Sequence, residues 1–355
     1  MKEISKKTKQ SLSTYALVIA FYAVCEIWLK TGNMSSLMEG LLVPLCYYMI
    51  LAVSLNIVVG ISGELSLGHA GFMCVGAFTG AIFAVTAGSG LPELLELVIA
   101  IILGAAVSGA FGFLIGIPVL RLRGDYLAIV TLAFGEIIKN VINAIYLGVD
   151  SNGIHISIKD AMSMGLAADG VTIIKGAQGI TRLPRNANFT IGIILLLISL
   201  FIIQNLINSR QGRAIMAIRD NRIAAESIGL SVSKYKMMAF VISAALAGVA
   251  GVLYAHNLST LQATPKNFGY NMSIMILVFV VLGGIGNIKG SMIAAVILTI
   301  LPEKLRFLSD YRMLIYAVVL IVMMLFNSAP KAIAFRERLV ESINMKRNKN
   351  AKEEA

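Results

Sequence analysis

Long apolar segments alternate with short polar connections along most of the 355-residue chain. The segments approach the ~20 residues that an α-helix needs to cross the hydrocarbon core of a membrane. We predict ten membrane-spanning helices, at residues 15–29, 41–59, 69–87, 94–120, 126–147, 189–207, 237–256, 272–286, 292–308 and 314–326. The pattern therefore predicts an all-α, polytopic membrane domain at residues 1–330, followed by a basic tail at residues 331–355.

Composition supports a membrane protein, because 57% of the residues are hydrophobic and only 14% are charged. Soluble domains have about 45–50% apolar and about 25% charged residues. A soluble enzyme, a disordered chain and a secreted disulfide scaffold are therefore excluded. The net charge of +11 is explained by basic cytoplasmic loops, so we expect lipid and no nucleic acid as a partner.

The first apolar segment follows Lys2, Lys6, Lys7 and Lys9, an arrangement also typical of a signal peptide. No small-x-small cleavage site precedes Lys30, so we interpret the segment as a retained span. If both termini are cytoplasmic, twenty Lys and Arg residues lie in the terminal segments and the inner connections, whereas nine lie in the outer connections. This asymmetry predicts cytoplasmic termini in a plasma-membrane protein.

Two connections are too long to be simple turns. Residues 148–188 are glycine-rich and polar, and we expect them to cap the outer mouth. Residues 209–236 lie inside, where Asp220 and Asn221 can cap a short helix and Gly229 can end it in a left-handed turn. This helix either rests on lipid headgroups or docks into a groove on a cytoplasmic partner. Periodicity alone does not choose between these roles.

Two glycine-rich stretches, residues 60–71 and 283–290, interrupt the apolar pattern in the two halves of the chain. Unwound backbone inside a membrane is tolerated only beside protein or a water-filled cavity, and paired breaks indicate a transport pathway. The alternative is a pair of tight turns at the membrane surface. The candidate pathway or hinge residues are Ser62, Gly63, Glu64, Ser66, Gly68, Gly284 and Gly286.

Few ionisable residues lie within the spans. Glu136 and Lys139 are three residues apart and share a helix face, so they can form an intramembrane ion pair with either a structural or a functional role. Glu64 is a candidate proton relay or a residue at the cytoplasmic boundary. No phosphate-binding G-x-x-x-x-G-K-[ST] motif is present in the sequence, so any ATP hydrolysis must come from another chain.

Four sequence blocks resemble the LivM-type permeases of branched-chain amino acid ABC importers. They are SLNIVVGISGELSLGHAGFMCVGAF (54–78), RLRGDYLAIVTLAFGEII (121–138), GRAIMAIRDNRIAAESIGLSVSKYKMMAFVISAALAGVAGVLYAH (212–256) and VFVVLGGIGNIKGSMIAA (278–295). The resemblance implies a heterodimer with a LivH-type permease, two cytoplasmic ATPases that use ATP and Mg, and an extracytoplasmic amino-acid-binding protein. No cofactor is implied in this chain.

The resemblance also implies that the inner helix is the coupling helix that contacts an ATPase, through Ala224, Ala225, Glu226 and Gly229. Many importers carry E-A-A-x-x-x-G there, whereas this chain has Ile223 in place of the first glutamate. The leading hypothesis is a non-enzymatic subunit for import of leucine, isoleucine and valine. The alternatives are a related urea or short-chain amide importer, an autonomous secondary transporter or channel, and an intramembrane enzyme.

Overall fold

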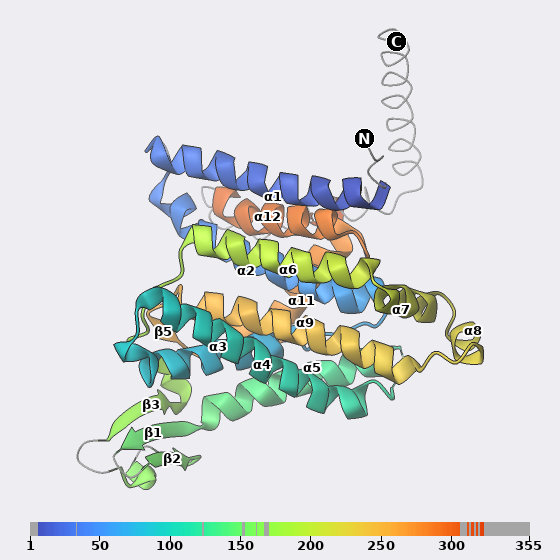
Figure 1. Ribbon diagram of the computed structural model, residues 1–355. Coiled ribbons are helices and arrows are strands. Elements are labelled where there is room, and N and C mark those ends of the chain that lie inside the picture. The colour runs from blue at the N-terminus through green and yellow to red at the C-terminus, as the bar shows by residue number, and fades with distance from the viewer. Residues whose placement is uncertain are drawn as a thin grey trace. The chain divides into compact units, whose positions relative to one another are not determined.

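The computed structural model in Figure 1 describes residues 6–322, apart from 33, 123, 151, 152, 161, 167–169, 306–310, 312, 313, 316 and 319. The chain forms two compact units, residues 1–296 and 297–355. The first unit contains the features discussed below. The predicted basic tail at residues 331–355 and six of the thirteen residues of the predicted span at 314–326 lie outside the described residues.

Helices make up most of the described chain. The long helices are α1 (Lys6–Lys30), α2 (Ser36–Asn56), α3 (His69–Val85), α4 (Glu93–Val119), α5 (Asp125–Ala144), α6 (Phe189–Asn208), α7 (Arg210–Asp220), α9 (Val232–Ala255), α11 (Tyr270–Gly283) and α12 (Ile288–Lys304). The short ones are the π-helix η1 (Ile57–Ile61), α8 (Arg222–Ser227), α10 (Pro265–Phe268) and the 3-10 turns η2 (Gly88–Gly90), η3 (Met162–Met164) and η4 (Gly176–Gln178).

Seven segments of the described chain are long and apolar enough to cross a membrane, fewer than the ten predicted from sequence. They are 11–30, 36–61, 93–119, 125–144, 189–208, 232–255 and 265–283. The apolar helix α3 has only 17 residues, and α12 is equally short and includes Lys289, Glu303 and Lys304. Both predicted segments thus contain a helix, but each of these helices is shorter than the other spans.

The prediction of an all-α chain was wrong for the long connection after α5. Strands β1 (Tyr146–Asp150), β2 (Gly153–Ser157) and β3 (Val171–Lys175) form an antiparallel sheet in the order β2-β1-β3. A second pair joins β4 (Ile180–Thr181) to β5 (Thr260–Leu261). As predicted, this connection is not a span. Figure 1 shows the three-stranded sheet at the opposite end of the long helices from α7 and α8.

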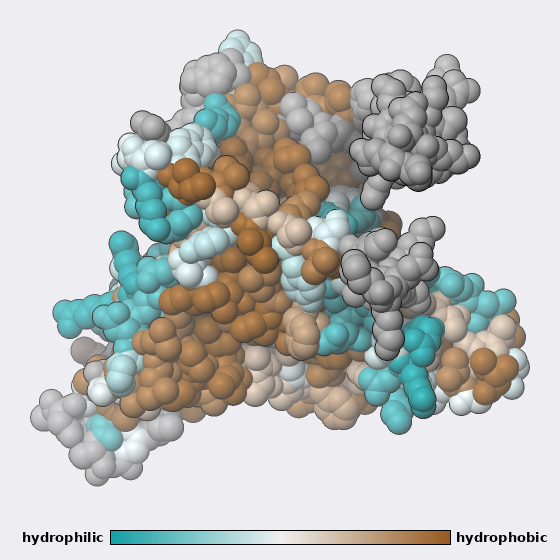
Figure 2. All heavy atoms as spheres, turned by 45° about the horizontal axis from the view of Figure 1, so that its top comes forward, coloured by the Kyte–Doolittle hydropathy of each residue, from teal (hydrophilic) through white to brown (hydrophobic). Residues whose placement is uncertain are grey.

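The interior of the first unit is built around α2, α3 and α9. The apolar windows of α2 and α9 are 89% and 72% buried, whereas that of α1 is only 11% buried. Close packing depends on small residues, because a Cβ atom at Gly76 of α3 would overlap the Gly248 backbone of α9. The outer surfaces of the helices are strongly apolar, as the brown area in Figure 2 shows. Peripheral α1 is thus placed to face lipid.

Candidate transport pathway and coupling site

The first glycine-rich stretch begins as a π-helix and then unwinds. Helix α2 continues into η1, where the Ser62 N–H donates to the carbonyl oxygen of Ile57 at 2.9 Å. The chain then runs without helix from Ser62 to Gly68, turning at Gly63 with φ +74° before α3 starts. Single π-turns and breaks in membrane helices are both frequent at functional sites.

The second glycine-rich stretch joins α11 to α12. Gly284 and Gly286 have φ values of +92° and +82°, which favour glycine because a Cβ atom would be strained there. Gly290 lies against Gly283, so the last turn of α11 and the first turn of α12 are in close contact. This stretch is a sharp reversal rather than an unwound helix centre.

The structure brings these two stretches into direct contact through Asn56, the last residue of α2. Its side-chain oxygen accepts a hydrogen bond from the Gly286 N–H at 2.9 Å, and its amide nitrogen donates to Ser291 Oγ at 2.9 Å. Asn56 is fully buried. A Cβ atom at Gly60 would lie only 2.7 Å from Gly286 Cα. The contact therefore depends on one buried amide and on the absence of a side chain at position 60.

Two cationic side chains, one on α7 and one near the start of α9, contact the first stretch. Arg219 of α7 donates from Nη1 to the carbonyl oxygen of Gly60 at 2.8 Å, and its aliphatic stem lies beneath Gly63. Lys236 of α9 forms an ion pair with Glu64, and both side chains are largely buried. Because Glu64 is paired with Lys236, a structural role for Glu64 is an alternative to the proton-relay hypothesis.

The long connection between α6 and α9 contains two helices where the sequence predicted one. Helix α7 begins at Ser209, whose hydroxyl accepts from the Gly212 N–H at 3.0 Å. Of the two predicted capping residues, Asn221 caps α8, and its side-chain oxygen accepts from the Ala224 N–H at 3.1 Å. Asp220 is instead the last residue of α7, where it pairs with Arg219. Gly229 has the predicted left-handed backbone, with φ +85°. The predicted connection 209–236 is shorter in the structure because α9 starts at Val232.

The two faces of α8 differ in their exposure to solvent. Ala225 is buried in a cluster with Ile218 and Val232, which fixes α8 to α7 and to the start of α9. Ile223 and Ile228 are 80% and 75% exposed. Figure 2 shows an apolar patch among polar residues at the end of the molecule where Figure 1 places α8. Exposed isoleucines on an anchored helix are typical of a docking surface.

The remaining residues of α8 contribute less to its position. Glu226 pairs with Arg222 at 2.9 Å on the surface, where such pairs are worth little. Ala224 donates its N–H to the Asn221 cap. Gly229 donates its N–H to the carbonyl oxygen of Glu226 at 3.0 Å, and Leu230 donates to Ala225 at 3.1 Å. These bonds close the helix end in a tight turn.

Glu136 and Lys139 form an ion pair on α5. The second oxygen of Glu136 accepts a hydrogen bond from the backbone N–H of Tyr270, the first residue of α11, at 2.7 Å. The carboxylate therefore caps an adjacent helix, and the nearly buried Lys139 balances its charge. This geometry favours the structural role for the pair.

Of the other predicted pathway residues, Ser62, Ser66 and Gly68 are buried. Gly68 lies against the backbone of Thr131 in α5, and the neighbouring Leu67 N–H donates to Thr131 Oγ1 at 3.0 Å. Sequence reasoning missed Asn56 and Arg219. Asn56 was detectable as an amide in an otherwise apolar span, but nothing in the sequence showed its partners.

The family described as "branched-chain amino acid transport system / permease component" matches residues 37–326. The chain belongs to this permease family. It is a multi-pass membrane protein and a transport component of ABC systems rather than an enzyme.

The permease proteins LivM of Salmonella typhimurium and of Escherichia coli K12 are each 38% identical over 79% of the chain. The chain spans 66% of the length of these curated relatives. The ribose import permease RbsC of Escherichia coli K12 is 27% identical over 79% of the chain and 81% of its own length. No solved structure matches the chain significantly.

Proposed function

We propose that the chain is the transmembrane permease subunit of an ATP-driven importer for leucine, isoleucine and valine. It forms the translocation pathway together with a second, LivH-type permease. The observation that carries this proposal is the 38% identity, over 79% of the chain, to permeases described as high-affinity branched-chain amino acid transport proteins. The scarcity of charge within the spans supports a pathway built between subunits rather than an ion-coupled transporter.

The energy comes from two cytoplasmic ATPases that bind ATP and Mg. An extracytoplasmic amino-acid-binding protein delivers the substrate. This chain holds no cofactor of its own, and its contribution is mechanical. The positive-inside distribution of Lys and Arg supports cytoplasmic termini, which places α7 and α8 on the ATPase side. The sheet β1–β3 then faces the binding protein at the opposite end (Figure 1).

Helix α8 is the coupling helix in this proposal, and Ile223 and Ile228 dock into an apolar groove of an ATPase. Figure 1 shows α8 beyond the end of α9, away from the long helices. That position supports a protein groove over the lipid headgroups as the binding surface. The buried Ala225 anchors α8, so a push on its exposed face moves α7 as well.

Movement of α7 reaches the pathway through Arg219. Its guanidinium bonds the carbonyl oxygen of Gly60, and Gly60 lies against Gly286. Lys236 and Glu64 provide a second link, from the start of α9 to the unwound segment. The breaks at Ser62–Gly68 and Gly284–Gly286 act as hinges, so the spans alternate between outward and inward openings. Contacts between named atoms support each link of this route, and variants at those atoms test whether the link carries coupling.

The experiment is reconstitution of the chain into vesicles with a LivH-type permease, the two ATPases and the binding protein. We expect ATP-dependent uptake of labelled leucine that unlabelled isoleucine and valine reduce. Urea, acetamide and ribose at equal concentrations serve as competitors for the alternative substrate classes. Uptake that only urea or acetamide reduces would reassign the substrate, and leucine flux through the chain alone would favour the autonomous transporter.

A further inference from the structure

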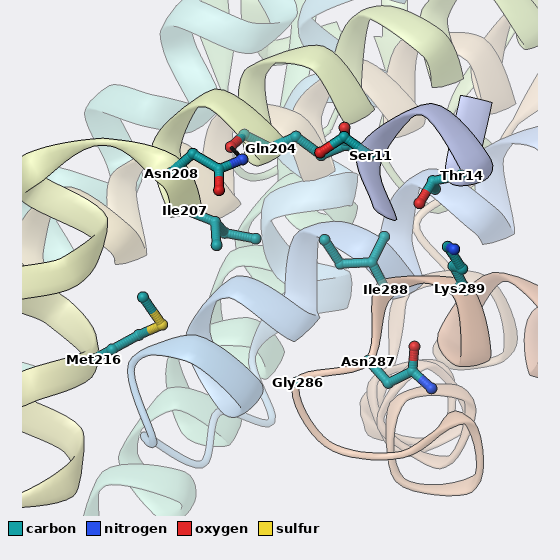
Figure 3. A pocket seen from close by; sticks show the side chains of 10 residues that line it. All are labelled: Ser11, Thr14, Gln204, Ile207, Asn208, Met216, Gly286, Asn287, Ile288 and Lys289. Carbon is teal, nitrogen blue, oxygen red and sulfur yellow. Dashed lines mark hydrogen bonds between the residues drawn. The ribbon is translucent and has the colours of Figure 1, made fainter. Parts of the chain in front are cut away.

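A polar pocket of about 460 Å³ lies where α1, α6, α7 and the 284–287 turn meet. Gln204 and Asn208 of α6 line one side, and Ser11 and Thr14 of α1 and Lys289 of α12 line the other (Figure 3). Its volume falls within the ~300–1,000 Å³ typical of small-ligand sites. Residues 286–289 of the second glycine-rich stretch and Met216 of α7 complete the lining together with Ile207, so the pocket adjoins the proposed hinge.

Gln204 contributes a buried hydrogen-bond acceptor to the pocket. Only 7% of the residue is exposed, and its Oε1 atom has no hydrogen-bond partner among the described residues. A buried carbonyl oxygen without a partner is costly, so the site favours a ligand that donates a hydrogen bond. A hydroxyl group can donate this hydrogen bond.

The other polar groups favour negative charge. Lys289 extends its ammonium to Ser13 Oγ at 2.7 Å, which leaves further N–H donors for an anion. An adjoining pocket of about 490 Å³ shares Ser11, Gln204 and Asn208 and adds Arg213. Arg213 donates to the carbonyl oxygen of Asn208 at 2.9 Å from one of its five N–H groups. Two cations therefore flank the shared residues.

The adjoining pocket also shows where the rest of the ligand lies. Tyr15 and Phe201 line it, and they lie about one helical turn from Ser11 and Gln204, toward the middle of α1 and α6. Phe201 continues an exposed apolar row on α6 with Ile198 and Ile194. A free anion in water gains nothing from this row, whereas the acyl chains of a lipid can lie along it.

We propose that these two pockets bind the headgroup of an anionic phospholipid that carries hydroxyl groups, such as phosphatidylglycerol. Its phosphate accepts from Lys289 and Arg213, and a glycerol hydroxyl donates to Gln204 Oε1. The acyl chains follow the row from Phe201 to Ile194. Basic pockets between membrane helices at the cytoplasmic face are suited to such headgroups.

The bound lipid would hold α1 against α6. Within the described residues, these helices also meet at Tyr22, which bonds Thr190 Oγ1 at 3.2 Å, and at the rings packed on Phe189. Those contacts lie near the start of α6, whereas the lipid pocket lies near its end. The proposal does not depend on the transported substrate or on the ATPases.

The test is native mass spectrometry of the purified full-length chain in detergent, after exchange into mixed phosphatidylglycerol and phosphatidylcholine micelles. We expect phosphatidylglycerol to remain bound to the wild-type chain. Lys289→Gln and Gln204→Leu should each lower its retention at least fivefold. The matched control Lys234→Gln removes an exposed lysine outside both pockets and should retain the lipid as the wild type does.

Two further measurements separate the possible sources of the phosphate. In nanodiscs, phosphatidylglycerol should raise the Tm of the wild type by several degrees over phosphatidylcholine, and this gain should vanish in Lys289→Gln. Glycerol 3-phosphate, added as the soluble headgroup, should not displace the lipid at millimolar concentration. Equal retention in all variants, or ready displacement by glycerol 3-phosphate, would overturn the proposal.

Discussion

Replacement of Gly60 by alanine tests the contact between the two glycine-rich stretches. Residue 60 lies in η1 with a backbone conformation that alanine can adopt, so the new methyl group acts through its contacts. Its Cβ atom would lie 2.7 Å from Gly286 Cα and would overlap the side-chain oxygen of Asn56. The nearest Gly286 atom, its backbone nitrogen, would lie 2.4 Å from this Cβ atom, whereas ordinary contact begins near 3.4 Å, so the two segments must separate by about 1 Å.

That separation breaks the 2.9 Å hydrogen bond from the Gly286 N–H to Asn56. An unpaired buried donor costs about 1–3 kcal/mol, and an overpacked methyl group costs about 1–3 kcal/mol more. We therefore expect Gly60→Ala to weaken the contact between the two segments by about 2–6 kcal/mol. Because the segments form the proposed hinge, the main consequence should be a large loss of ATP-driven leucine uptake.

The assay compares membrane insertion, Tm in detergent and leucine uptake for Gly60→Ala and the matched variant Gly40→Ala. Gly40 is also on α2, but no atom lies within 4 Å of a Cβ atom there, so this variant should insert and transport normally. Wild-type uptake together with an unchanged Tm in Gly60→Ala would refute the reasoning, because the segments would then tolerate separation.

Three further changes test the coupling helix and the ion pair. Gly229→Pro should abolish uptake without blocking insertion, because proline cannot adopt φ +85° or donate to Glu226, whereas Gly229→Asn should retain most uptake. Joint replacement of Ile223 and Ile228 by serine should leave the Tm unchanged but reduce co-purification of the ATPases, and undiminished co-purification would contradict the docking role. Lys139→Met should destabilise the chain by about 3 kcal/mol in denaturant unfolding, since it leaves Glu136 without its cation, and the added change Glu136→Gln should recover part of this loss.

The sequence predicted the cap and the end of α8 correctly, although it missed α7. Asn221 caps α8 and Gly229 ends it, because both effects depend on a few neighbouring residues. The glycine-rich stretches were visible because they interrupt an apolar pattern. Their roles as a pathway and a hinge remain predictions.

The sequence did not predict which residues far apart in the chain pair with one another. Asn56 and Gly286 are separated by 230 positions, and Arg219 and Gly60 by 159. Nothing in the polarity pattern of either segment specifies its partner, because the packing of α2, α7 and α12 decides which side chains meet. The role of Glu136 as a cap on α11 depends in the same way on tertiary contact.

The structure differs from the predicted number of spans and from the predicted all-α fold class, and both differences have physical causes. Helix α3 is buried against α4 and α9, so an apolar run of 17 residues is explained as much by burial as by membrane crossing. The sheet β1–β3 was missed because its strands have only five residues each and only partly buried faces. Short strands of this kind are stabilised by pairing that the local sequence does not reveal.

The most direct test of the central claim measures ATP hydrolysis and leucine uptake together in the reconstituted transporter carrying Arg219→Gln. Arg210→Gln, at the exposed first position of α7, is the matched control. Loss of the Arg219 bond to Gly60 should leave ATP hydrolysis nearly intact and remove most leucine uptake, while the control behaves as the wild type. Full leucine uptake by Arg219→Gln would contradict transmission from α7 to the glycine-rich hinge.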